Sequence, residues 1–197
     1  MRSNRCSSRD LTALILAGGR ATRLGGIDKR TIVIDGATIF DRQCAVLLPR
    51  VAEIIISTSR ATSGYRTVQD ATSGLGPLAG VAAGLAAATT PWLLVVAGDM
   101  PFITGALIDR MVERARPDID AVGIRIGDAP EPLVSVLHVS TCLAVVERRI
   151  AAGQLKASAL LTDAALRVSW LDETDVRAID PELRVLRNVN TPDDVHS

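Results

Sequence analysis

The segment "LTALILAGGRATRLGGIDKR", residues 11–30, joins two unlike halves. Residues 11–17 form an unbroken apolar run, which predicts a β-strand covered on both faces. The second half is rich in glycine and carries Arg20, Arg23, Asp28 and Lys29. Because ligands of open α/β sheets bind beyond the carboxyl ends of the strands, a charged, glycine-rich loop at this place predicts an anion site.

The residue types in this loop suit a polyphosphate. Gly18 and Gly19 remove side chains, so that backbone N–H groups can approach an anion closely. Arg23 and Lys29 add charge-assisted hydrogen bonds to phosphate oxygens. The loop matches neither the P-loop nor the GxGxxG pattern, and an ordinary solvated surface turn would have a similar composition. The sequence predicts a phosphate-binding loop of another kind.

The rest of the chain alternates between apolar strands and amphipathic helices. We expect further strands over 51–57, 66–70, 91–99, 120–126, 132–137 and 166–171, and helices over 38–50, 76–90, 104–116 and 140–152. In the first helix, Phe40, Cys44, Leu47 and Leu48 are predicted to share the buried face. A strand and a helix over 184–195 are expected to close the chain. This order predicts a three-layer α/β/α Rossmann-like fold with a mostly parallel, mixed sheet, forming one domain over 10–197 after a flexible tail, 1–9.

Composition excludes several classes of function. Of the 197 residues, 48% are hydrophobic and 22% charged, and 22 basic residues balance 22 acidic ones, so no overall field favours nucleic acid or membrane. Aromatic residues are 3%, which leaves few surfaces for stacking bases. The three cysteines are scattered, as expected of a cytoplasmic chain. The apolar stretch 78–97 is interrupted by Thr89, Thr90 and Pro91, which favours a helix and a strand over a membrane span.

Two acids follow predicted strands and are candidate ligand contacts. Asp99, after the apolar run 92–97, can hold Mg²⁺ against substrate phosphates, because magnesium takes one or two protein carboxylates. Asp70 can accept hydrogen bonds from a base or a ribose. The alternative for each is an ordinary aspartate that opens a turn or caps a helix.

Four segments together carry a family resemblance. "LAGGRATRLGGIDK" (16–29), "GPLAG" (76–80), "GDMP" (98–101) and "NVNTPDDV" (188–195) resemble the LAGG…DK, GPLAG, CDMP and NINTPEDL motifs of nucleotidyltransferases, closest to the molybdenum cofactor guanylyltransferases. Gly98 replaces a frequent cysteine, and Leu24 replaces a methionine at similar volume. The double glycine at 18–19 favours the guanylyl branch over its cytidylyl relatives.

The resemblance implies a reaction and a set of site residues. GMP would pass from GTP to the phosphate of molybdopterin, with release of pyrophosphate and with Mg²⁺ as cofactor. Arg23, Lys29 and Asp99 would be catalytic, and Mg²⁺ would be held by Asp99 and Asn190. The nucleotide would contact Leu16, Ala17, Gly18, Gly19, Lys29, Ser59, Asp70, Gly76, Pro77 and Asp99. Transient contacts with other cofactor-biosynthesis proteins and acceptor molybdoenzymes would follow.

The acceptor and the base leave alternatives open. "EPLVSVLH" (131–138) resembles the family's segment near the pterin acceptor, but family members often have an aromatic residue where Leu137 or His138 stands. A cytidylyltransferase for the same pterin, or a sugar-phosphate or polyol-phosphate nucleotidyltransferase, would share the fold. A GTP-binding accessory module without catalysis is the alternative from another class.

Overall fold

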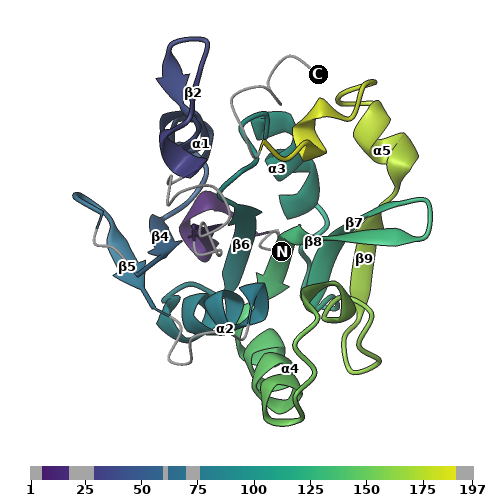
Figure 1. The fold of residues 1–197 in the computed structure, drawn as a ribbon. Helices are drawn as coiled ribbons and strands as arrows, with labels where there is room; N and C mark the ends of the chain where they lie inside the picture. Colours follow the sequence, from purple (N-terminus) through teal and green to yellow (C-terminus); the bar gives the residue numbers. More distant parts are fainter. Residues whose placement is uncertain (1–5, 18–28, 60–61, 70–75, 190–197) are drawn as a thin grey trace.

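A computed structural model describes residues 6–17, 29–59, 62–69 and 76–189. Within these ranges a central sheet has seven strands in the order β5-β4-β1-β6-β8-β7-β9 (Figure 1). The strands are β1 (Leu11–Leu16), β4 (Glu53–Ser57), β5 (Arg66–Val68), β6 (Trp92–Ala97), β7 (Ala121–Ile126), β8 (Ala129–His138) and β9 (Val168–Leu171). The predicted fold class is confirmed.

The sheet is parallel around β1 and mixed beyond β6. β1 pairs in parallel with β4 and β6, and β4 pairs in parallel with β5. β8 runs antiparallel to both β6 and β7, whereas β9 is parallel to β7. The carboxyl ends of β1, β4 and β6 therefore meet at one edge of the sheet, and the amino-terminal part of β8 comes to the same edge.

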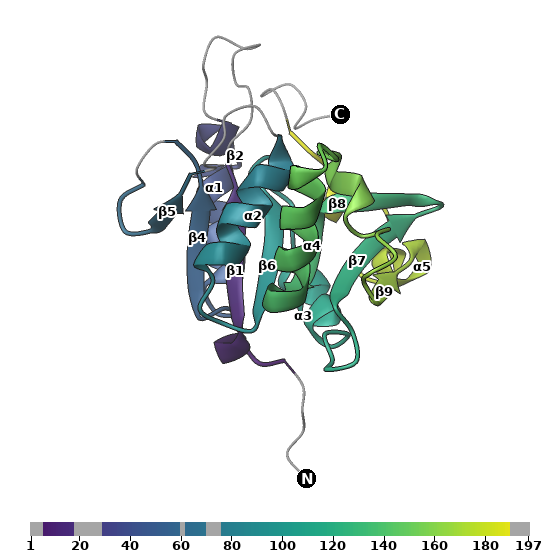
Figure 2. The same cartoon turned by 90° about the horizontal axis from the view of Figure 1, so that it is seen from below.

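Helices cover both faces of the sheet. Figures 1 and 2 show α2 and α4 side by side on one face, with α1 and α3 on the other. Their bounds are α1 (Ile39–Leu47), α2 (Pro77–Ala87), α3 (Gly105–Val112) and α4 (Val139–Ala151). The apolar stretch 78–97 consists of most of α2 and all of β6, as predicted. No helix in the described ranges is long and apolar enough to cross a membrane.

The strand pleat divides the apolar side chains between two cores. Ala13 and Ile15 of β1 pack in the core under α1 and α3, while Leu14 packs in the core under α2 and α4. β6 divides in the same way, with Leu94 on the first side and Leu93 on the second. Successive side chains of a strand point to opposite faces, so a continuous apolar run fills both layers.

A short hairpin precedes α1. β2 (Val33–Ile34) and β3 (Ala37–Thr38) pair antiparallel across Asp35 and Gly36, both of which have positive φ. An Asp-Gly pair favours the tight turn that such a two-residue hairpin loop requires. Thr38 then caps α1, because its hydroxyl accepts a hydrogen bond from the Asp41 N–H.

The buried face of α1 differs from the prediction. Leu48 lies just past the last helical residue and is 58% exposed, so its assignment to the buried face is wrong. Gln43 is fully buried in the helix, between the turns that carry Ile39 and Leu47. The spacing of four residues places these three side chains on one face.

The end of the chain also differs from the prediction. A short helix, α5 (Glu173–Arg177), follows β9 and was not expected; Asp172 and Asp175 cap it reciprocally. The strand expected from 184 is wrong, because 184–186 form a 3₁₀ turn instead. The helix expected beyond residue 190 lies outside the described residues.

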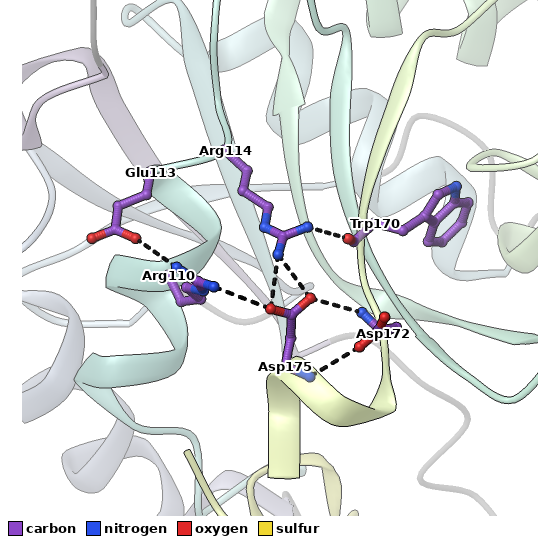
Figure 3. Close-up of polar contacts among 6 residues, drawn as sticks. All are labelled: Arg110, Glu113, Arg114, Trp170, Asp172 and Asp175. Atoms are coloured by element: carbon purple, nitrogen blue, oxygen red, sulfur yellow. Dashed lines mark hydrogen bonds and ion pairs between the residues drawn. The ribbon is translucent and has the colours of Figure 1, made fainter. Parts of the chain in front are cut away.

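A polar network ties α5 to the helix α3. Figure 3 shows the Arg114 guanidinium pointing at the Asp175 carboxylate and at the carbonyl oxygen of Trp170 on β9. Arg110 of α3 also donates to Asp175, and Glu113 pairs with Arg110. Burial raises the pKa of Asp175, but hydrogen bonds from Arg110 and the Asp172 backbone lower it on balance. The network holds the last strand of the sheet to the layer of α3.

Candidate active site

The carboxyl ends of three neighbouring strands form the base of the candidate site. The N–H of Ala17 donates to the carbonyl of Ser57 at 3.0 Å, and the N–H of Gly98 donates to the carbonyl of Leu16 at 2.9 Å. A Cβ atom on Gly98 would lie 2.9 Å from the Leu16 carbonyl oxygen, so glycine permits this close approach. Ala17 and Gly98, which follow β1 and β6, therefore lie close together at this edge.

Lys29 and Asp99 meet at this edge. The Lys29 Nζ lies 3.1 Å from the Asp99 Oδ2, although 70 residues separate them in the chain. The two side chains are 35% and 24% exposed, so both remain accessible from solvent. The ammonium and the carboxylate that the resemblance assigns to one site therefore lie together at one rim.

The segment before Asn190 reaches the same place. The N–H of Val189 donates to the Asp99 carbonyl at 2.7 Å. The Val189 side chain is fully buried in a small apolar cluster with Ile32, Ile34 and Ile39. These contacts bring the last described residue next to the Asp99 backbone.

The amino-terminal turn of α2 lies against the same strand ends. A Cβ on Gly80 would come within 2.7 Å of the Ser57 Oγ and 2.9 Å of the Leu16 side chain. Gly76, with φ of +71°, caps this helix, and Pro77 is its first residue. The backbone N–H groups of a helix amino terminus favour anions.

Some of the site residues predicted from the sequence lie together in the structure, and others lie outside the described residues. Leu16, Ala17, Lys29 and Asp99 lie at the rim described above. Ser59 is exposed two residues after β4, and its carbonyl accepts from the Gln69 amide at 3.2 Å. Gly18, Gly19, Arg23, Asp70 and Asn190 lie outside the described residues.

Two residues at this edge escaped the prediction. Gln43 donates from its side-chain amide to the carbonyls of Ala97 and Met100, on either side of Gly98 and Asp99. The sequence marks Gln43 only as a polar residue midway between the apolar residues Ile39 and Leu47, which share one face of the helix. Glu131 lies in the part of β8 that comes to this edge. Burial raises the pKa of the Glu131 carboxyl, and the charge of Asp99 raises it further.

The donor set at the rim fits magnesium. Asp99 supplies a partly exposed carboxylate at the end of a strand, the hard oxygen ligand that Mg²⁺ prefers. The described residues bring no three His, Cys, Asp or Glu side chains together. Magnesium does not require such a group, because it commonly takes one or two carboxylates with substrate phosphates and waters.

Comparisons with known proteins identify the family of this chain. The model of the MobA-like NTP transferase domain matches residues 13–168. The chain belongs to the MobA-like NTP transferase family. As a member it is a nucleotidyltransferase, and the family identification made from the motifs is confirmed.

Individual relatives extend the match over most of the chain. The molybdenum cofactor guanylyltransferase of Pseudomonas putida strain GB-1 is 34% identical, over 91% of this chain and 93% of the relative. The enzyme of the same name from Serratia proteamaculans is 35% identical, over 80% of this chain and 82% of the relative. The crystal structure of molybdopterin-guanine dinucleotide biosynthesis protein A from Archaeoglobus fulgidus superposes with a TM-score of 0.76 at 25% identity, covering 94% and 95% of the two chains.

Proposed function

We propose that this nucleotidyltransferase transfers GMP from GTP to the phosphate of molybdopterin and releases pyrophosphate. The single observation that supports a working site best is the 3.1 Å contact between Lys29 and Asp99 at the carboxyl edge of the sheet. The names of the relatives from Pseudomonas putida and Serratia proteamaculans support the choice of substrates.

The reaction needs positioning and charge neutralisation. An oxygen of the molybdopterin phosphate attacks the α-phosphorus of GTP, and the bond from that phosphorus to the β-phosphate oxygen breaks, so that pyrophosphate leaves with the electron pair. A phosphate monoester has its second pKa near about 6, so the attacking oxygen is largely ionised at neutral pH. No side chain is required to remove a proton.

The histidine within the described residues fits this account. The His138 ring lies 5.1 Å from the ring of Trp92, edge to face. Trp92 begins β6, whereas Asp99 follows its end, so six residues of strand separate the histidine from the candidate site. We assign His138 no part in the transfer.

The charged residues divide the remaining work. Asp99 would hold Mg²⁺, with Asn190 as a second ligand, and the ion when bound would neutralise charge on the phosphates. Lys29 and Arg23 would balance the charge that develops on the leaving pyrophosphate. Leu16, Ala17, Gly18 and Gly19 would shape the phosphate cradle, while Ser59, Asp70, Gly76 and Pro77 would contact the nucleoside.

A pyrophosphate-release assay tests the proposal. The purified chain is given molybdopterin with GTP, CTP, UTP or ATP, with Mg²⁺ or with excess chelator. We expect GTP with Mg²⁺ to give the dinucleotide and the other nucleotides to give little. A preference for CTP would identify a cytidylyltransferase. GTP binding without any Mg²⁺-dependent product would identify an accessory module, and turnover of a sugar phosphate in place of molybdopterin would change the acceptor.

A further inference from the structure

Gln43 is a buried polar residue with a defined pair of partners. It lies on the inner face of α1, and its side chain has no exposed surface. Its Nε2 donates to the Ala97 carbonyl at 2.7 Å and to the Met100 carbonyl at 3.1 Å. Both partners are acceptors without a hydrogen to give, so the nitrogen of the amide must face them and the orientation is fixed.

The two carbonyls lie on either side of Asp99, the proposed metal ligand, in the chain. Gly98 and Asp99 lie between them, and each makes its own backbone bond, Gly98 to Leu16 and Asp99 to Val189. The short loop at the end of β6 is therefore held from α1, from β1 and from the end of the described chain. Since the backbone is fixed at these points, so is the direction of the Asp99 Cα–Cβ bond, from which the carboxylate extends.

This arrangement leaves one buried polar atom of Gln43 without a partner within the described ranges. The Gln43 Oε1 is buried and has no hydrogen-bond partner among the described residues. A buried acceptor without a partner destabilises a fold, and a methionine of similar size would remove it, although it would also take the Gln43 donor away from the carbonyls of Ala97 and Met100. The neighbours Ile39, Cys44 and Leu47 are apolar and would accept such a side chain.

We propose that Gln43 is a positioning residue for the transfer reaction, which sets the direction of the Asp99 carboxylate by holding the carbonyls of Ala97 and Met100. The inference rests on the proposed function, in which Asp99 holds the metal ion. Gln43 is buried under the loop that follows β6, and we assign it no contact with substrate.

The test replaces Gln43→Met and measures kcat and KM for GTP. Because small displacements of reacting groups are costly, we expect kcat to fall by about 10- to 100-fold while KM for GTP changes by less than about 3-fold. The control is Thr12→Val. Thr12 is also fully buried and bonds to the Thr90 hydroxyl at 2.7 Å, but it lies at the opposite end of β1. Thr12→Val is expected to lower the melting temperature and to leave kcat within about 2-fold.

A double-mutant cycle separates positioning from general packing. In an Asp99→Asn background the carboxylate that Gln43 positions is gone, so adding Gln43→Met should change the residual kcat by less than about 3-fold. Full additivity of the two effects would overturn the proposal. So would a Gln43→Met enzyme that folds and keeps its kcat.

Two further measurements remain decisive if activity is ambiguous. A crystal structure of Gln43→Met should show the Lys29–Asp99 contact lengthened from 3.1 Å beyond hydrogen-bonding range, and an unchanged contact would overturn the inference. If Gln43→Met does not fold, Gln43→Asn, which keeps the amide but is one methylene too short to reach both carbonyls, takes its place, and failure of both variants to fold would make Gln43 a purely structural residue. A wild-type chain without guanylyl transfer would instead overturn the proposed function.

Discussion

Lys29 and Asp99 form an ion pair whose value for stability is small. Both side chains are partly exposed, and exposed pairs of this kind contribute about 0–1 kcal/mol to the free energy of unfolding. Lys29 follows β1 and Asp99 follows β6 in the chain, and the two meet at the edge where β1, β4 and β6 end. This small contribution to stability agrees with the proposal that both charges act on the phosphates of the substrate.

Replacing Lys29→Ala tests this directly. If the ammonium stabilises the leaving pyrophosphate, kcat should fall by about 100-fold or more, while the free energy of unfolding changes by less than about 1 kcal/mol. Steady-state pyrophosphate release and chemical denaturation measure the two quantities. Lys156→Ala, at the chain's other lysine, is the control and should alter neither. A Lys29→Ala enzyme with a near-normal rate would remove this residue from the mechanism.

At the scale of the elements, the contact between α2 and β1 is unusually close. A Cβ atom on Gly84 would lie 2.4 Å from the Leu14 Cδ2 and 3.0 Å from its Cγ. Leu14 is fully buried in the core under α2 and α4, so it has little room to move. The glycines that the sequence places inside this helix are therefore explained by the approach of a neighbouring strand.

Gly84→Ala should destabilise the protein despite its better helix propensity. Propensity favours alanine by about 1 kcal/mol, while overpacking a core costs about 1–3 kcal/mol, so we expect a net loss of up to about 2 kcal/mol. Chemical denaturation gives the value. Ala86→Gly, at an exposed position of the same helix, should also destabilise, by about 1 kcal/mol from propensity. A stabilised Gly84→Ala variant would show that Leu14 can give way.

An acid between elements should make stability depend on pH. Hydrogen bonds from Arg148 of α4, with others from the Ala165 backbone and Arg149, lower the pKa of Asp163 to about 2 from the ordinary 3.8. A carboxyl whose pKa is lower in the folded state than in the unfolded state stabilises the folded state at pH values above its unfolded pKa. This stabilisation is lost as the pH falls from about 4 to about 2.

Asp163→Asn should remove that dependence. We expect the variant to be less stable than the wild type at pH 7 and the difference between them to shrink as the pH falls from about 4 to about 2. Denaturation curves at several pH values measure the difference. Asp128→Asn, at an exposed turn, is the matched control. A difference that stays constant over this range would mean that the arginines do not act on the charge of Asp163.

At the scale of the whole molecule, the sequence predicts what depends on local pattern. The buried strands β1, β4 and β6 are continuous apolar runs, and their carboxyl ends were expected to meet because parallel strands share an edge. Lys29 and Asp99 were assigned to one site by the family resemblance, and the shared edge brings them within 3.1 Å of each other. Helix α5 was missed because five residues give too short a pattern, and the 184–186 turn was mistaken for a strand because Val185 and Leu186 form a short apolar run.

Other features depend on tertiary contacts and leave weak traces in the sequence. Leu48 follows the periodicity of α1 but lies past its end, where the helix no longer presents a buried face. In the sequence Gln43 is an ordinary polar residue of an amphipathic helix, and only the structure shows its contacts with the loop after β6. Its role depends on a contact between segments 54 residues apart, which no local pattern encodes.

A site assembled from distant segments should stabilise the whole fold when it is filled. The rim unites the end of β1, the 3₁₀ turn at Lys29, the loop at Asp99 and the backbone of Val189. A nucleotide that bridges these segments binds the folded chain and not the unfolded one. At about 100 times its Kd it should add about 2.7 kcal/mol, or raise the Tm by about 5–10 °C for a chain of this size.

Thermal unfolding with nucleotides checks this expectation and locates its source. GTP with Mg²⁺ should raise the Tm, and CTP at the same concentration should raise it by much less. In Asp99→Asn the shift with GTP should lose its dependence on Mg²⁺, because the carboxylate that holds the ion is gone. Thr12→Val, with its substitution at the far end of β1, should melt lower but keep the full GTP shift. An Asp99→Asn variant whose shift still required Mg²⁺ would place the ion on other ligands and leave Asp99 without its assigned part.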